Sequence, residues 1–179
     1  ATILAVVAVG LLGRRLGGDR VGLVAAGLAA VYPALWINDG MLQPESLLAL
    51  LTALVLLAAF RLDEEPSRPR AAVLGGLIGL ATLTRPEMLL YAPLLLLPLV
   101  LRRSELARRE RFRRVLIGLG ATLLVLAPWL VLNQVRFGRP SLANSQGSVI
   151  AESSCASTYY GRFIGYQANC HPDFPLPIE

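Results

Sequence analysis

The sequence predicts an all-α protein, a bundle of about six helices that cross a membrane, followed by an irregular polar tail. Hydrophobic residues make up 55% of the 179 residues, 16% are charged and the mean hydropathy is +0.58. Charged residues form about 25% of a typical soluble domain. The apolar residues fall in long runs without an amphipathic stripe, and 179 residues are too few to surround such helices with protein. These observations place the chain in a membrane.

Six apolar segments follow one another along the chain, separated by short polar stretches. They are residues 1–13, 21–37, 46–60, 71–84, 88–101 and 115–132. We divide residues 71–101 in two because one helix of those 31 residues would reach about 46 Å, well over the ~30 Å hydrocarbon core. Pro86 also disfavours helical geometry at Arg85. We therefore predict a hairpin that turns at Arg85-Pro86-Glu87.

All 17 basic residues are arginines, and most of them lie between the apolar segments. Nucleic-acid binding would need them gathered on one phosphate-tracking surface, so their spread argues against that class of partner. Placing the stretches 14–20, 61–70 and 102–114 in the cytoplasm puts 13 of the 17 arginines inside, as the positive-inside rule requires. The stretch 38–45 and the turn at 85–87 then face outside.

We predict two regions, a transmembrane region of residues 1–132 and an extracytoplasmic segment of residues 133–179. Glycine and proline break the second region into short pieces, so we expect loops with brief strands. Its two cysteines, Cys155 and Cys170, would lie in an oxidising compartment, which favours a disulfide over two free thiols. The chain has one histidine, and it forms no recognisable zinc motif with them.

The chain starts at Ala1 inside an apolar run of 13 residues, shorter than the ~20 residues that a span needs. We expect a fragment whose first helix is cut short. A cleaved signal peptide is less favoured, because no basic region precedes the run and no small-residue cleavage site follows it.

Two carboxylates, Asp39 and Glu45, lie between the second and third segments, and an ionised side chain at the centre of a membrane helix costs about 2.5–3.5 kcal/mol. A carboxylate can accept a proton from a sugar hydroxyl or bind a cation, and an arginine such as Arg85 can hold a phosphate with two hydrogen bonds. The structural alternative is that Asp39 forms a turn, Glu45 begins a helix at its positive end and Arg85 pairs with Glu87. This alternative is favoured for Asp39, whereas composition leaves both readings open for Glu45 and Arg85.

Three stretches carry a family resemblance: YPALWINDGMLQPE at 32–45, LTRPE at 83–87 and PWLVLNQVRFGR at 128–139. Through them the chain resembles the polytopic GT-C glycosyltransferases, and more narrowly the glycosyltransferase family 39 or aminoarabinose-transferase-like group, relatives of the protein O-mannosyltransferases. The resemblance covers nearly the whole chain in order, and the loop from Cys155 to Cys170 is similar to the outer-loop continuation of some bacterial members. The chain departs from the pattern at Leu132, where members often carry arginine.

The resemblance implies an inverting transferase that moves a sugar from a polyprenyl-phosphate donor to a lipid, glycan or protein acceptor. It also implies a general-base aspartate in a loop that would precede Ala1, so the fragment is expected to be inactive by itself. The second acidic position falls on Glu45, which would support the acceptor or a divalent metal, and Arg85 would hold the donor phosphate. Candidate supporting residues are Asp39, Glu87 and Tyr32.

The alternative function is a transporter or flippase for a lipid-linked or anionic solute, which also places arginine and carboxylates among its spans. Such transporters tend to carry internal repeats, and the sequence shows no convincing repeat. A structural membrane subunit would explain the spans but not Glu45 and Arg85. The predicted location is the cytoplasmic membrane, with membrane lipids as partners, and the sugar, carrier lipid, acceptor and metal requirement are left open.

Overall fold

The computed structural model describes residues 1–40, 44–102, 107–143 and 159–160, and the regular structure among them is helical, without a strand. The helices are α1 (Thr2–Val31), α2 (Pro33–Gly40), α3 (Glu45–Glu64), α4 (Arg68–Thr84), the 3-10 helix η1 (Pro86–Leu90), the π-helix η2 (Ala92–Leu96), α5 (Leu97–Leu101) and α6 (Arg108–Phe137). They belong to one unit of residues 1–140, and residues 141–179 form a second unit. The prediction of an all-helical protein is confirmed for the described residues.

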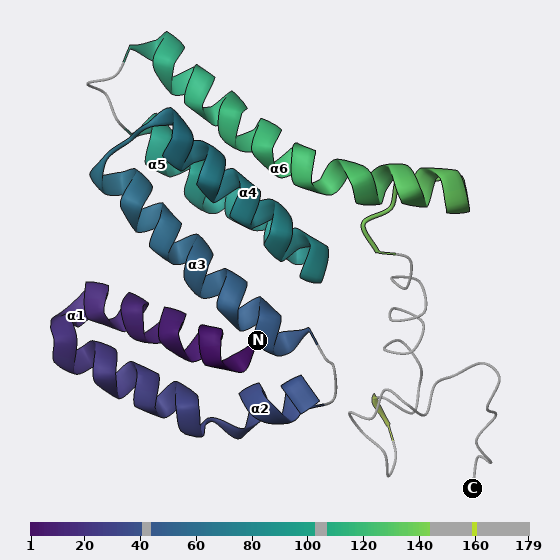
Figure 1. Cartoon of the computed structure of the whole chain (residues 1–179). Helices are drawn as coiled ribbons and strands as arrows, with labels where there is room; N and C mark the ends of the chain where they lie inside the picture. Colours follow the sequence, from purple (N-terminus) through teal and green to yellow (C-terminus); the bar gives the residue numbers. More distant parts are fainter. Residues whose placement is uncertain (41–43, 103–106, 144–158, 161–179) are drawn as a thin grey trace, which may run out of the picture. The chain divides into compact units, whose positions relative to one another are not determined.

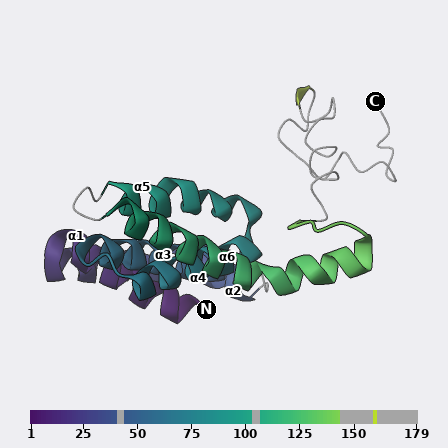
Figure 2. The same ribbon diagram turned by 90° about the horizontal axis from the view of Figure 1, so that it is seen from above.

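The helices of the first unit form a row in which neighbours pack side by side. Helix α1 contacts α3, α3 contacts α4 and α4 contacts α6, and Figure 1 shows this row from α1 at the bottom to α6 at the top. The helices η1 and η2 pack against α4, while α5 packs against α3 and α6. Figure 2 shows this returning segment as a second layer beside the row.

Helix α1 reverses direction at Gly17 and Gly18, so that its 30 residues form two antiparallel arms. Gly18 has a φ of 82°, a left-handed conformation that residues with a side chain rarely adopt. The arms approach closely through small residues, because a Cβ atom on Gly10 would lie 2.9 Å from that of Ala26. The reversal falls within the polar stretch 14–20 that the sequence predicts between the first two apolar segments.

Replacing Gly18 with alanine is expected to destabilise the fold by about 1–2 kcal/mol through backbone strain. The space around this position is open, so a clash does not contribute. Gly27 lies in the helical second arm and is equally open, so Gly27→Ala should be neutral or stabilising by up to about 1 kcal/mol. Thermal unfolding in one detergent measures both variants, and an equal shift of the two melting temperatures would contradict the positive φ at Gly18.

The apolar segment predicted at residues 21–37 is not one helix. Helix α1 ends at Val31, Tyr32 adopts an extended conformation with φ −74° and ψ 108°, and Pro33 begins α2. Proline has no N–H to continue the ladder of α1, and it disfavours helical geometry in the residue before it. The prediction of a continuous segment is therefore wrong at Tyr32.

The hairpin predicted at Arg85-Pro86-Glu87 is present. Helix α4 ends at Thr84, and the chain turns back into η1 from Pro86. The returning segment combines 3-10, π and α geometry, because Pro86, Pro93 and Pro98 each remove a backbone donor. A single helix across residues 71–101 is excluded.

Helix α6 continues past the predicted region boundary at Leu132 and ends at Phe137. Gly138 follows with a φ of 71°, the left-handed conformation that commonly terminates helices. Pro128 lies inside α6, and the helix bends along its length in Figure 1, as an internal proline causes.

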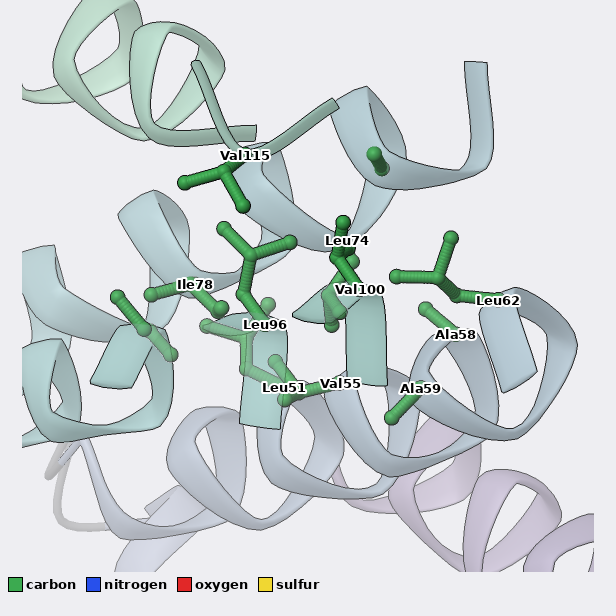
Figure 3. Close-up of a cluster of buried hydrophobic side chains, with 13 residues drawn as sticks. Leu51, Val55, Ala58, Ala59, Leu62, Leu74, Ile78, Leu96, Val100 and Val115 are labelled. Carbon is green, nitrogen blue, oxygen red and sulfur yellow. The ribbon is translucent and has the colours of Figure 1, made fainter. Parts of the chain in front are cut away.

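A hydrophobic core joins α3, α4 and the returning segment. Leu62 from α3, Leu74 and Ile78 from α4, Leu96 from η2 and Val100 from α5 are fully buried. Figure 3 shows Leu74, Leu96 and Val100 gathered between the helices. This core fixes α3 against α4 and so determines which residues meet at their ends.

Two described helices, α3 and α6, are long and apolar enough to cross a membrane, and residues Pro86–Leu101 form a shorter apolar helix. Large apolar side chains are exposed on α1 and α6, including Leu23 and Leu124. Many exposed large apolar side chains on long helices are typical of contact with lipid or with further helices. The count of six spans stays a prediction.

The arginine-rich connections meet at one end of the first unit, which we call the arginine end. It comprises the reversal of α1, the α3–α4 connection, the end of α5 and the start of α6, which lie at the left in Figure 1. Ion pairs link these pieces: Arg15–Glu64, Arg70–Glu65, Arg102–Asp63 and Arg68–Glu110. Because α3 and α4 are antiparallel neighbours, the start of α3 and the end of α4 lie at the opposite end.

Candidate functional site

Glu45 is the first residue of α3, and Pro44 precedes it with helical dihedral angles. In the first turn a carboxylate lies near the positive end of the helix dipole, which stabilises its charge. The side chain is 34% exposed. The start of α3 thus holds a carboxylate in a half-buried position.

Arg85 occupies the turn between α4 and η1. Its backbone is extended, with φ −145° and ψ 120°, the region that a following proline favours. Its N–H donates to the carbonyl of Ala81 at 3.0 Å, and its own carbonyl accepts from the N–H of Met88 at 3.0 Å. The backbone is therefore held on both sides of the residue.

The side chains of Glu45, Arg85 and Glu87 form a group that we call the carboxylate–arginine cluster. Nη2 of Arg85 donates to Oε1 of Glu45 at 2.6 Å, and Nη1 lies 3.6 Å from Oε1 of Glu87. The hydrogen bond with Glu45 raises the pKa of Arg85 further above its ordinary value. The guanidinium is consequently charged at every physiological pH and lies between two carboxylates.

Two polar atoms of this cluster lack a hydrogen bond within the described residues. Oε2 of Glu45 and Nε of Arg85 are buried and have no hydrogen-bond partner within the described part of the chain. A buried polar atom without a partner costs about 1–3 kcal/mol. The cluster therefore presents one unsatisfied acceptor and one unsatisfied donor, which a ligand carrying both kinds of group would satisfy.

An apolar groove of about 350 Å³ lies between the end of α4 and the second half of α6. Its lining residues are Leu83, Val125, Pro128, Trp129 and Leu132. Leu83 precedes Arg85 by two positions, so the groove begins next to the cluster in the chain. Sequence reasoning missed this groove, and its one signal was the Pro128-Trp129 motif noted in the family resemblance.

The remaining predicted site residues are Tyr32, Asp39 and the two cysteines, and of these the structure describes the side chain of Tyr32 alone. Tyr32 is exposed at the end of α1, and no hydrogen bond links its side chain to the cluster within the described ranges. Asp39 falls in the last turn of α2. The predicted disulfide between Cys155 and Cys170 lies outside the described residues.

The described residues contain no group of three or more histidine, cysteine, aspartate and glutamate side chains able to hold a metal ion. Glu45 and Glu87 both face the guanidinium of Arg85. In this arrangement the positive charge between the two carboxylates comes from the protein itself.

The structure agrees with part of the structural alternative for Glu45 and Arg85. Glu45 does begin a helix and Arg85 does lie near Glu87, as the structural alternative predicts. The shorter contact, however, joins Arg85 to Glu45 across 40 positions of sequence, which neither reading predicts. The candidate donor-binding arginine and the candidate acidic residue thus share one site.

A comparison with protein families matches residues 1–132 to the family described as dolichyl-phosphate-mannose-protein mannosyltransferase. The match includes all three members of the carboxylate–arginine cluster and the whole apolar groove. No curated protein and no solved structure gives a significant match.

Proposed function

The chain belongs to the dolichyl-phosphate-mannose-protein mannosyltransferase family, whose members are membrane glycosyltransferases, and from this premise we propose that it transfers a sugar from a polyprenyl-phosphate donor. The acceptor is a lipid, a glycan or a protein, and the reaction takes place at the outer face of the cytoplasmic membrane. The observation that supports the proposal most strongly is the position of Arg85 between Glu45 and Glu87, at the end opposite to the arginine end.

Arg85 binds the donor phosphate through one edge of its guanidinium. Nε and Nη2 point along that edge and can donate two parallel hydrogen bonds to phosphate oxygens. Nε has no partner among the described residues and Nη2 is held by Glu45, so entry of the phosphate displaces one carboxylate. Glu87 remains beside Nη1 and keeps the guanidinium oriented during the exchange.

In the transfer step, an acceptor hydroxyl oxygen attacks the anomeric carbon on the face opposite to the phosphate. The bond between that carbon and the phosphate oxygen breaks, and polyprenyl phosphate leaves with the electron pair. The hydroxyl proton passes to a carboxylate that acts as the general base. Glu45, released from Arg85, orients the acceptor hydroxyl, and Arg85 stabilises the charge that develops on the leaving phosphate.

The apolar groove holds the first part of the polyprenyl chain. Leu83 brings its rim next to the residue that binds the phosphate, and Trp129 offers a broad apolar face. Leu132 takes the place of the arginine that family members often carry. This substitution keeps the groove apolar and leaves Arg85 as the phosphate ligand of this site.

All six apolar segments cross the membrane in this proposal. Helices α3 and α6 have the required length and composition, and the arms of α1 and residues 86–101 pack against them or against α4. The positive-inside rule then orients the arginine end toward the cytoplasm. The carboxylate–arginine cluster and the segment 133–179 lie on the outer side.

Replacing Glu45 with glutamine in the full-length protein is expected to lower sugar transfer at least about tenfold, roughly 1.4 kcal/mol of barrier. The amide keeps the shape of the side chain but removes the negative charge that orients the acceptor. Transfer is measured with a synthetic polyprenyl-phosphate sugar and the protein in lipid vesicles.

Glu65→Gln is the matched control, because Glu65 is exposed and pairs with Arg70 at the arginine end. Its transfer rate should stay within about twofold of wild type, as expected for loss of a surface ion pair. Unchanged transfer in Glu45→Gln would remove that residue from the site. Movement of the lipid-linked sugar across the vesicle membrane without transfer would instead favour a transporter.

A further inference from the structure

A second cavity, of about 760 Å³, lies at the arginine end. Its lining residues are Leu101 at the end of α5 and Arg108, Arg109, Arg111 and Phe112 at the start of α6. None of these residues belongs to the carboxylate–arginine cluster or to the apolar groove. The proposed transfer reaction therefore leaves this cavity without a role.

The cavity is positively charged, and its charge is not neutralised from within the described part of the chain. Arg108 and Arg109 are exposed and make no ion pair with a described carboxylate. Nη1 of Arg111 donates to the carbonyl of Leu101 at 2.9 Å, which leaves the charge uncompensated. Nε of Arg111 is buried and has no hydrogen-bond partner among the described residues.

In contrast to the arginines that line the cavity, the neighbouring Arg113 and Arg114 of α6 lie near a carboxylate. Arg113 and Arg114 each lie 4.0 Å from a carboxylate oxygen of Glu110, and Arg68 donates to the same carboxylate at 2.6 Å. Glu110 thus pairs with arginines that do not line the cavity. Among the described arginines in the first turns of α6, those without a carboxylate partner are the ones that line the cavity.

Apolar side chains flank these charges. Phe112 is 63% exposed and Leu101 is 50% exposed, both at the rim of the cavity. The apolar run of α6 starts directly after this region, at Val115. Arginines beside an exposed aromatic ring at the start of an apolar helix are typical of the headgroup level of a membrane.

We propose that this cavity binds the phosphate headgroup of an anionic phospholipid. Arg108 and Arg109 hold the phosphate, the buried Nε of Arg111 offers a further donor, and the acyl chains lie along Phe112 and Leu101. Basic pockets at the cytoplasmic ends of membrane helices bind anionic lipid headgroups. The inference rests on the membrane location of α6 and is independent of the transfer reaction.

The test uses the full chain in detergent and titrates dihexanoyl-phosphatidylglycerol by calorimetry, with dihexanoyl-phosphatidylcholine and inorganic phosphate in parallel. The anionic lipid should bind at least about tenfold more tightly than either of the other two. The double variant Arg108→Gln/Arg109→Gln should weaken binding of the anionic lipid at least about tenfold, and Arg109→Gln alone should change it in the same direction. Both arginines are exposed, so the helical circular dichroism should not change.

The control is Arg61→Gln/Arg113→Gln, which removes the same charge from the same end but does not touch the cavity. Its affinity for the anionic lipid should stay within about twofold of wild type. An equal loss in the control would mean general charge attraction and would overturn the proposal. Equal affinity for phosphatidylcholine, or for inorganic phosphate, would overturn it as well, the latter by identifying a site for the free ion.

Discussion

Replacing Arg85 with alanine in the full-length protein is expected to lower kcat/KM for sugar transfer at least about thirtyfold, roughly 2 kcal/mol. The variant lacks both of the hydrogen bonds proposed above for the donor phosphate. It also removes the cation that pairs with the half-buried carboxylate of Glu45. Steady-state transfer with varied donor concentration measures the effect, which should appear in KM for the donor as well as in kcat.

An exchange of the two charges separates a binding role from a purely structural one. The double variant Glu45→Arg/Arg85→Glu rebuilds an ion pair between α3 and α4 but moves the guanidinium to the start of α3. Its melting temperature should recover relative to Arg85→Ala, whereas transfer should not recover. Recovery of transfer together with stability would mean that Arg85 acts only by joining the two helices.

The second large effect is expected at Gly75, where α4 and α6 are in backbone contact. A Cβ atom at this position would lie 2.0 Å from the carbonyl oxygen of Gly118, a distance that only movement of a helix can relieve. The hydroxyl of Thr122 also donates to the carbonyl of Gly75 at 2.8 Å, and separation of the helices breaks this bond. We expect Gly75→Ala to lower the free energy of unfolding by about 3 kcal/mol or more, at or above the upper end for overpacking.

Gly76 provides the matched control for this prediction. It is the next residue of α4, and a Cβ atom there would meet nothing within 4 Å. Gly76→Ala should therefore be neutral or stabilising by up to about 1 kcal/mol, because alanine favours the helix more than glycine does. Thermal or denaturant unfolding of both variants in the same detergent measures the change in the free energy of unfolding. Similar changes for Gly75→Ala and Gly76→Ala would contradict the close contact of α4 with α6.

The turns of the fold could be predicted from the sequence because they are encoded locally. The reversal at Gly17-Gly18 lies in a polar, glycine-rich stretch, and the turn at Arg85 is dictated by Pro86. The break at Tyr32 was missed although Pro33 carries the same signal, because the apolar run on both sides suggested one span. Hydropathy reports burial in lipid and is insensitive to a local change of backbone direction.

The site could be predicted only in part. Charge in an apolar setting identified Glu45 and Arg85 as candidates, but their hydrogen bond depends on how α3 lies against α4. That arrangement follows from a core distributed over five elements, α3, α4, η2, α5 and α6, which no local pattern specifies. The groove beside Trp129 was missed for the same reason, since a cavity is a property of the space between helices.

The glycine contact between α4 and α6 has a consequence for the distant cluster. Gly75 and Gly79 both press against α6, so they set the rotation of α4 about its own axis. Arg85 leaves the end of that helix ten residues beyond Gly75, about 15 Å along the axis. A small rotation at the glycines would swing the guanidinium away from α3, and a misplacement of about 1 Å can cost a hundredfold in rate. The two glycines thus fix the orientation of α4, and substitutions there are expected to misplace Arg85 while most of the helices remain folded.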